Sequence, residues 1–243
     1  MTLYERIKEN YELPYKFRLT KRTPVIIRLD GKAFHSFTKG FSKPFDPILM
    51  QAMQLTMLEL CKNIQGATFG YTQSDEISIL LQDYENLDTS AWFDYEVQKL
   101  CSVSASMATL FFNRFFEELA EEYSLPEEQH YEARLKASRS GAFFDARCFN
   151  LPKEEVVNYF LCRQMDAVRN SIQMVGQFYF SPKELNRKSC DEIQQMLSEK
   201  GIDWKSYRTC EQRGSSCYKT DGWILDYTIP DFRDNRDYIE RYV

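Results

Sequence analysis

The chain has 243 residues, of which 43% are hydrophobic and 28% charged, and its formal net charge is −5. This length and apolar content suit a folded protein with a full-sized core and exclude a disordered chain. The charged N-terminal stretch and the lack of an apolar run of about 18 residues argue against a signal peptide and a membrane span, so we expect a cytoplasmic protein.

The periodicity of apolar residues predicts helices and strands in alternation. Asp46 and Pro47 are typical of a helix N-cap followed by proline at the first helical position. Two short apolar runs around the polar turn Gln73–Glu76 indicate a hairpin. In chain order we expect a packed surface helix at 2–12, a strand at 24–30, a helix at 48–61, strands at 67–72 and 77–81, a helix at 91–122, a charged connection at 123–140, a strand at 141–149 and a helix at 152–176.

This order of elements predicts an α+β fold of the ferredoxin-like, split βαβ type, with an antiparallel sheet like that of a polymerase palm. We assign residues 1–176 to a palm-like catalytic domain. Residues 177–243 form a smaller extension packed on it, with a helix at 181–201 that has a Ser-Pro start and a glycine stop, and a hairpin at 215–228.

The seven cysteines are scattered without a C-x-x-C motif, which predicts reduced thiols and argues against structural zinc. The two histidines, His35 and His130, are too few for a histidine-rich metal site. A site for a metal that prefers oxygen ligands is not excluded by these counts.

Arg28 and Asp30 share one face of the first strand, because successive side chains on a strand point to opposite faces. An aspartate at the end of a buried strand, followed by Gly31, can present a carboxylate and backbone groups to a phosphate or a metal. A strand that simply ends in a turn has the same pattern. Eight basic residues surround Asp30, the one acid between residues 16 and 43, which fits either a polyphosphate site or a solvated basic loop.

In the split βαβ arrangement the first strand lies beside and antiparallel to the third, so Asp30 and Asp75 are expected on adjacent strands, about 5 Å apart. Two such carboxylates, with the Gly31 carbonyl, can hold a pair of Mg²⁺ ions roughly 4 Å apart. Asp75 taken alone also fits a turn aspartate with a local hydrogen bond. Glu76 is either a supporting carboxylate behind the metal ligands or an exposed side chain.

Several segments together resemble the tRNA-His guanylyltransferase family, over roughly residues 24–176, and specifically its bacterial and archaeal-type "like" branch. They are IIRLDGKAFHSF, FSKP, FGYTQSDEISILL, W-F-x5-K ending at Lys99, FDARCFNLP and NYFLCRQMDAVRNSI. The resemblance implies an enzyme that adds nucleotides in the 3′-to-5′ direction. ATP first adenylylates the 5′-monophosphate of a tRNA, and the 3′-hydroxyl of an incoming GTP or other NTP then attacks the activated end.

The resemblance further implies two Mg²⁺ ions at Asp30, Asp75 and the Gly31 carbonyl, and a homotetramer built as a dimer of dimers. It implies that residues 32–35 contact a nucleotide through backbone N–H groups and through an aromatic ring, that of Phe34, which stacks on the base. Phe34 as a core residue, Lys99 as a solvated lysine and Asn170 as a buried polar residue stay open as alternatives. The nucleotide-binding residues that it implies are Arg28, Lys32, Ala33, Phe34, His35, Lys43, Ser74, Lys99 and Asn170.

One segment departs from the eukaryotic members of that family. The chain reads Val168–Arg169–Asn170–Ser171 where those enzymes carry a motif that begins with histidine, the residue associated with tRNA-His recognition. This argues against a dedicated addition of one untemplated guanosine to tRNA-His. The "like" branch implies instead the templated repair of 5′-truncated tRNAs.

Two other function classes share a palm and two aspartates. One is a nucleotide cyclase or another palm nucleotidyltransferase, and the other is a non-catalytic RNA-binding palm. For contacts with tRNA phosphates the sequence offers a basic set in the C-terminal part, which fits a solvated face equally well: Lys183, Arg187, Lys188, Lys205, Arg208, Arg213 and Lys219.

Overall fold

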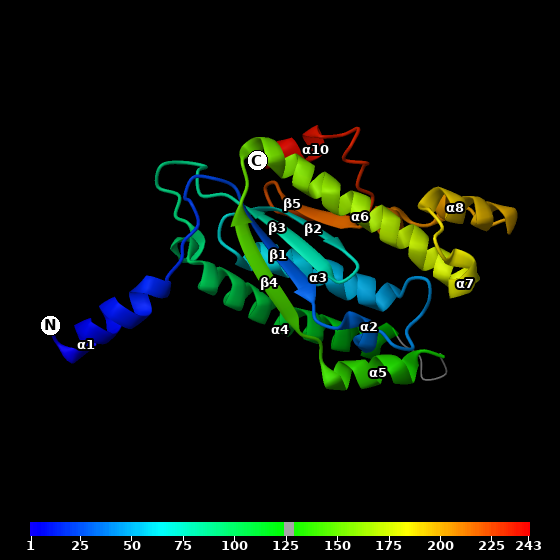
Figure 1. The fold of residues 1–243 in the computed structure, drawn as a ribbon, viewed down its shortest axis with the longest axis horizontal. Helices are drawn as coiled ribbons and strands as arrows, with labels where there is room; N and C mark the ends of the chain where they lie inside the picture. The colour runs from blue at the N-terminus through cyan, green and yellow to red at the C-terminus, as the bar shows by residue number, and fades with distance from the viewer. Residues whose placement is uncertain (124–128) are drawn as a thin grey trace.

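One six-stranded sheet runs through the molecule, in a computed structural model that describes residues 1–123 and 129–243 (Figure 1). Its strand order is β4-β1-β3-β2-β5-β6, and every neighbouring pair is antiparallel. The antiparallel sheet predicted from the sequence is therefore confirmed. The strands are β1 Val25–Gly31, β2 Ala67–Gln73, β3 Glu76–Leu81, β4 Phe144–Asn150, β5 Ser215–Lys219 and β6 Trp223–Asp226.

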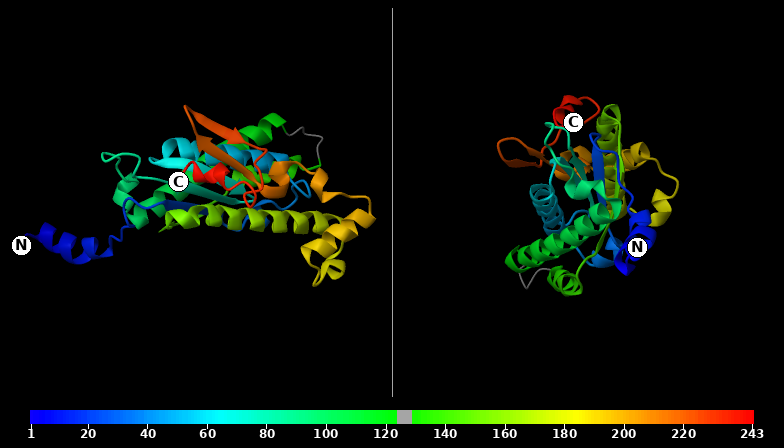
Figure 2. Two further views of the ribbon diagram at one scale, coloured as in Figure 1. Left: turned by 90° about the horizontal axis from the view of Figure 1, so that it is seen from above. Right: turned by 90° about the vertical axis from the view of Figure 1, so that its left-hand side faces the viewer.

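Helices cover both faces of the sheet (Figures 1 and 2). Helices α3 (Pro47–Asn63) and α4 (Val97–Tyr123) pack on one face, and α6 (Lys153–Tyr179) packs on the other. None of the helices in the described ranges combines the length and the apolar character that crossing a bilayer requires. The shorter helices are α1 Leu3–Ile7, α2 Phe34–Phe37, α5 Tyr131–Ser140, α7 Pro182–Leu185, α8 Cys190–Glu199, α9 Thr209–Arg213 and α10 Asp237–Glu240.

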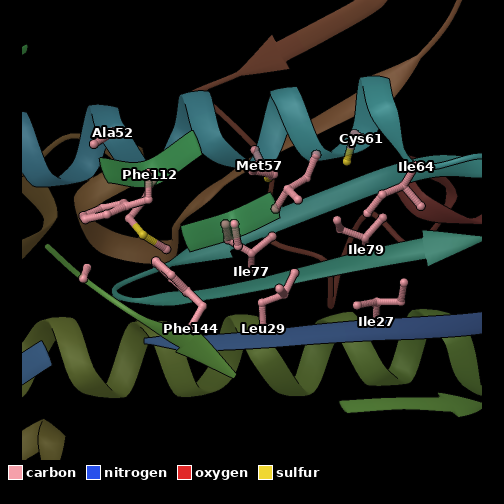
Figure 3. Close-up of a cluster of buried hydrophobic side chains, with 14 of the residues drawn as sticks. Ile27, Leu29, Ala52, Met57, Cys61, Ile64, Ile77, Ile79, Phe112 and Phe144 are labelled. Atoms are coloured by element: carbon pink, nitrogen blue, oxygen red, sulfur yellow. The ribbon is translucent and has the colours of Figure 1, made fainter. Parts of the chain in front are cut away.

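Strand β1 is buried from both sides. Ile27 and Leu29 point into the cluster that contains Met57 and Ile79 (Figure 3). Ile26 belongs to the cluster under α6. All of these side chains are at most 1% exposed. Because burial of such a side chain contributes about 2 kcal/mol, this core fixes the strand, and with it the residues at its C-terminal end.

The predicted pairing of the first strand with the third is confirmed, because Val25 lies opposite Leu81 and Asp30 opposite Glu76. The predicted C-terminal hairpin is also present. Its strand β5 pairs with β2, with Phe69 opposite Tyr218, so the segment after residue 176 lengthens the same sheet.

Four local predictions differ from the structure. The segment 123–140, expected as a connection, contains α5, and the described part of that segment is Tyr123 and residues 129–140. The helix expected at 181–201 is split into α7 and α8, because Arg187 has a φ of 62° that no helix accommodates. The helix expected from residue 91 begins at Val97, after a 3₁₀ turn at Trp92–Tyr95. The hairpin turn expected at 73–76 has two residues, since Gln73 and Glu76 pair with each other.

Residues 2–12 do not pack on the body, as a surface helix was expected to do. Residues 1–18 are exposed throughout, and α1 projects away from the sheet in Figure 1 and in the left-hand view of Figure 2. Its stability is local, because Thr2 and Glu5 form a capping box at the helix start.

Candidate functional site

The β2–β3 hairpin places its turn beside the end of β1. Ser74 and Asp75 form the turn, and the Ser74 hydroxyl donates to Asp75 Oδ1 at 2.9 Å. The Gly31 N–H donates to the Asp75 carbonyl at 3.0 Å, so the backbone itself joins the turn to β1. Ser74 has a φ of 51°, a backbone conformation that costs a non-glycine residue of order 1 kcal/mol and that often occurs at functional sites.

Three acidic side chains lie in a row on the face of the sheet that α6 covers. Asp30 lies opposite Glu76 on β3 and opposite Asp145 on β4. Their side chains differ in exposure, at 35% for Asp30, 7% for Glu76 and 63% for Asp145. Asp30 is therefore intermediate between the buried Glu76 and the exposed Asp145, and it is open to a ligand where Glu76 is not.

Arg28 is held between two of these acids. Its Nη2 lies 2.7 Å from Glu76 Oε2 and 3.7 Å from Asp30 Oδ2. The Arg28 side chain is 25% exposed. The structure thus brings a cation beside Asp30, on the strand face predicted from the sequence.

Glu76 has a second partner that the sequence analysis missed. Arg163 on α6 donates from Nη1 to Glu76 Oε2 at 3.0 Å, and its Nη2 contacts Asp166 one turn further along the helix. Burial raises the pKa of Glu76, while Arg163 and then Arg28 lower it. The sequence signal for this charged helix face was the spacing of Arg163 and Asp166, because residues three apart on a helix share one face.

An open pocket of about 440 Å³ lies at the end of β1. It gathers seven of the residues singled out in the sequence, from three separate segments. These are Gly31, Ala33, Phe34, His35, Lys43, Ser74 and Asp75. The space suits a ligand of nucleotide size, since ligand pockets in proteins commonly hold about 300–1,000 Å³.

Asn170 lines a smaller pocket of about 80 Å³ next to the first. Ser74 and Asp46 contribute to both pockets, so Asn170 lies near the hairpin turn although it comes from α6. Lys32 does not line the first pocket and lies instead in a groove on the other side of α2.

Phe34 lies at the pocket wall with its ring mostly in the core. It is 5% exposed, and its ring packs against Phe37, Phe112 and Phe144 at centroid distances of 5.2–5.4 Å. The ring also covers Gly31, where an added Cβ would fall 2.3 Å from a Phe34 ring carbon. Only glycine therefore fits at position 31, and of the two rings His35 is the exposed one.

Lys99 lies far from this pocket. It is on the first turn of α4, where the Val97 N–H donates to the Phe17 carbonyl before β1 begins. Ten residues later, about 15 Å along the helix, Thr109 accepts a hydrogen bond from Phe144, the residue opposite Gly31. Lys99 is therefore near the opposite end of the sheet, with its Nζ 5.7 Å from the centroid of the Phe93 ring.

The basic residues of the C-terminal part come from several different elements. Lys188 and Arg208 are each 2.8 Å from a glutamate of their own segment, Glu192 and Glu211. The others are Lys183 on α7, Arg187 between α7 and α8, Lys205 in a 3₁₀ turn, Arg213 at the end of α9 and Lys219 at the end of β5.

Asp75 lines the pocket, and Asp30 lies close enough to influence its carboxyl group. Burial raises the pKa of Asp75, the Ser74 hydroxyl lowers it, and Asp30 raises it further, so the two carboxyl groups interact. The described residues contain no group of three or more His, Cys, Asp or Glu side chains arranged around one metal position. Two carboxylates and a backbone carbonyl fit Mg²⁺, because this ion keeps several waters and takes further oxygens from substrate phosphates.

The raised pKa of Asp75 gives a prediction with opposite signs for activity and stability. Folding strengthens proton binding to Asp75, so its ionised form opposes folding as pH rises from its ordinary value of 3.8 through the raised pKa. Asp75→Asn should therefore stabilise the protein at neutral pH and abolish activity. Urea unfolding at pH 7 and at pH 3.5 measures this, and the stabilisation should vanish at the lower pH. An equal gain at both values would assign it to another cause.

The chain is similar in sequence and in fold to proteins of one family. The family model described as tRNAHis guanylyltransferase matches residues 4–152. A solved bacterial tRNA(His) guanylyltransferase (Thg1)-like protein in complex with ATP is 40% identical and superposes with a TM-score of 0.88, covering 100% of this chain and 99% of its own. The corresponding complex with GTP is 37% identical, with a TM-score of 0.81 and coverages of 99% and 98%. The tRNA(His) guanylyltransferase of Debaryomyces hansenii is 28% identical over 222 residues, which cover 86% of this chain and 75% of that protein.

The fold and the matches define the chain as a nucleotidyltransferase. It belongs to the tRNAHis guanylyltransferase family. The resemblance inferred from the sequence is thereby confirmed.

Proposed function

We propose that this protein is a Mg²⁺-dependent, palm-type enzyme that adds nucleotides in the 3′-to-5′ direction to the 5′ end of tRNA. In the first step a 5′-phosphate oxygen attacks the α-phosphorus of ATP, and pyrophosphate leaves. In the second the 3′-hydroxyl of an incoming NTP attacks the activated 5′-phosphorus, and AMP leaves. The observation that carries the proposal is the pocket in which Gly31, Lys43, Ser74 and Asp75 meet at the end of β1.

The proposal divides the work among charged groups of the site. Asp30, Asp75 and the Gly31 carbonyl would hold Mg²⁺, which when bound supplies positive charge to the developing phosphate oxyanions. Lys43 lies in the pocket as a cation for a triphosphate. Arg28, fixed by Glu76 at 2.7 Å, adds a second cation whose position does not depend on the ligand.

The nucleotides bound in two solved relatives support the choice of nucleotides for this protein. One solved relative holds ATP and another GTP, and they are 40% and 37% identical to this chain. We take ATP for activation and GTP or another NTP for addition. Val168 on α6 supports templated repair of 5′-truncated tRNA, because the eukaryotic enzymes carry a histidine at this position of the motif.

We propose a homotetramer, and the exposed N-terminal segment supports contact between copies of the chain. Leu3, Tyr4, Tyr11 and Phe17 are each more than 60% exposed on a segment that touches little of its own chain. Apolar side chains gathered on a projecting arm gain stability when a second copy covers them.

The proposed reaction has a direct test. The protein, incubated with ATP, GTP, Mg²⁺ and a 5′-truncated, 5′-phosphorylated tRNA, should lengthen the tRNA at its 5′ end, as resolved on a denaturing gel. Without ATP, a 5′-triphosphorylated version of the same tRNA should still be extended, because its end is already activated. A cyclic nucleotide formed from GTP alone would point to a cyclase, and tRNA that is bound but unchanged would overturn the catalytic proposal.

A further inference from the structure

A second groove lies on the other side of α2 from the nucleotide pocket. It holds about 700 Å³ and runs between α2 and α5, which lie side by side in Figure 1. Ala33 lines both the groove and the pocket, so the two spaces adjoin at the N-terminal end of α2. An RNA whose 5′ end occupies the pocket would pass Ala33 to reach the groove.

The groove is lined by lysines in an otherwise acidic protein. Lys32, Lys39 and Lys136 line it, and Glu132 is the one acid among the lining residues that the structure describes. All three lysines are exposed, and the ion pairs of the described residues include none of them. Since the whole chain carries a net charge of −5, this is a local reversal of sign. Ammonium groups free of protein partners are available to an anionic ligand.

The walls of the groove are fixed before any ligand arrives. Arg134 on α5 lies 2.9 Å from Asp46, which caps α3, and His130 Nδ1 lies 2.8 Å from the Gly40 carbonyl. Gly40 has a φ of 89°, and a Cβ added there would fall 3.0 Å from Ala133 on α5. A preformed groove loses little conformational entropy on binding.

We propose that this groove binds the phosphodiester backbone of the RNA whose 5′ end enters the nucleotide pocket. The inference rests on the proposed function and adds a path for the RNA. Lysines act as point charges toward phosphates and do not read sequence, which suits a contact that must accept many RNA ends. The groove lies beside the candidate site, whereas the basic residues of the C-terminal part come from several different elements.

The test compares two double variants that lose the same charge. Lys39→Ala/Lys136→Ala empties the groove of two cations. Lys62→Ala/Lys153→Ala is the control, because Lys62 is 13 residues along α3 from Leu49 and Lys153 is 17 residues along α6 from Asn170, about 20 and 25 Å from the pockets. Binding of a 5′-truncated tRNA is followed by fluorescence anisotropy without ATP, at several salt concentrations.

For the groove variant we expect about tenfold weaker tRNA binding at low salt. The slope of log K against log salt should fall by about 1.5, since each lost phosphate contact removes about 0.7–0.9. The control should bind within about twofold of the wild type with an unchanged slope, and Lys39→Arg/Lys136→Arg should restore binding. Affinity for a fluorescent ATP analogue should be equal in all four proteins.

Two results would overturn the inference. In one, the groove variant binds tRNA with the wild-type slope. In the other, it loses affinity for the ATP analogue and keeps its affinity for tRNA, which would make the groove a triphosphate site. Failure of the proposed function gives another result. The wild type would then bind tRNA and leave its 5′ end unchanged, and the groove variant would still bind tRNA more weakly than the wild type. Thermal unfolding of each variant confirms that the lost affinity is not lost folding.

Discussion

Asp30→Asn should lower the rate of 5′ extension by at least about a hundredfold. The amide keeps the shape of the side chain and removes the charge that, with Asp75, fits a divalent cation. Charge stabilisation by a bound metal is worth several kcal/mol in the transition state, and each 1.4 kcal/mol corresponds to about a factor of ten in rate. Single-turnover extension of a 5′-triphosphorylated tRNA measures the addition step alone, so that a defect in activation does not enter.

The neighbouring strand offers a matched control for this substitution. Asp145 lies directly opposite Asp30 on β4, on the same face of the sheet, but it is 63% exposed and pairs with Arg147 of its own strand at 3.4 Å. Asp145→Asn should change the rate by less than about threefold. Equal losses in the two variants would show that the negative field of the whole row matters, and a normal rate in Asp30→Asn would remove Asp30 from the site.

The arrangement of Asp30, Gly31 and Asp75 was predictable because it depends on local signals and one pairing rule. The alternating pattern of β1 gives the face of Asp30, and the polar turn between two apolar runs gives the hairpin that contains Asp75. Once the first and third strands pair, the backbone bond from Gly31 to Asp75 follows. The two strand patterns are local, and the pairing of the first strand with the third is the one long-range contact required.

The register of α4 shows where periodicity fails. The helical spacing of Leu100, Ala108, Phe111, Phe115 and Leu119 favours Phe111 and Phe115 as core positions. The structure buries Phe112 and Phe116 instead. Phe111 and Phe115 are four residues apart, and so are Phe112 and Phe116, so the 3.6-residue period fits both pairs. The choice is made by packing against Phe34, Phe37 and Phe41, which the helix pattern does not contain.

Arg163 and Lys99 show the same limit for charged side chains. Arg163 joins the site because the sheet places Glu76 under α6, with the two side chains 87 positions apart. Lys99 is separated from it because α4 runs the length of the sheet and only its later turns lie beside β4 at the site. Neither position follows from the local sequence, since both depend on how whole elements pack.

Asp46→Ala should lower the free energy of unfolding by about 4 kcal/mol. Asp46 is 4% exposed and accepts four hydrogen bonds, from the Leu49 and Ser42 N–H groups and from Nε and Nη2 of Arg134. Loss of a helix N-cap costs about 1 kcal/mol, and a hydrogen bond to a charged group such as Arg134 contributes about 1.5–3 kcal/mol. Urea unfolding followed by circular dichroism measures the change.

Two further variants separate the cap from the charge. Asp46→Asn keeps an acceptor for the Leu49 N–H and loses the charge that faces Arg134, so it should cost about half as much. Asp203→Ala removes a comparable cap from the exposed 3₁₀ turn Trp204–Ser206 and should cost less than about 1 kcal/mol. A small loss in Asp46→Ala would mean that the α5 contact contributes little to folding.

The same residue links stability to nucleotide binding. Asp46 lines both pockets and holds the loop that carries Lys43, so loosening it should weaken ATP binding as well as the fold. Saturating ATP adds stability in proportion to RT ln(1 + [L]/Kd). The gain from ATP should therefore be smaller in Asp46→Ala than in the wild type at one ATP concentration. Equal gains would show that Lys43 keeps its position without this cap, and that the loop is ordered by the pocket itself.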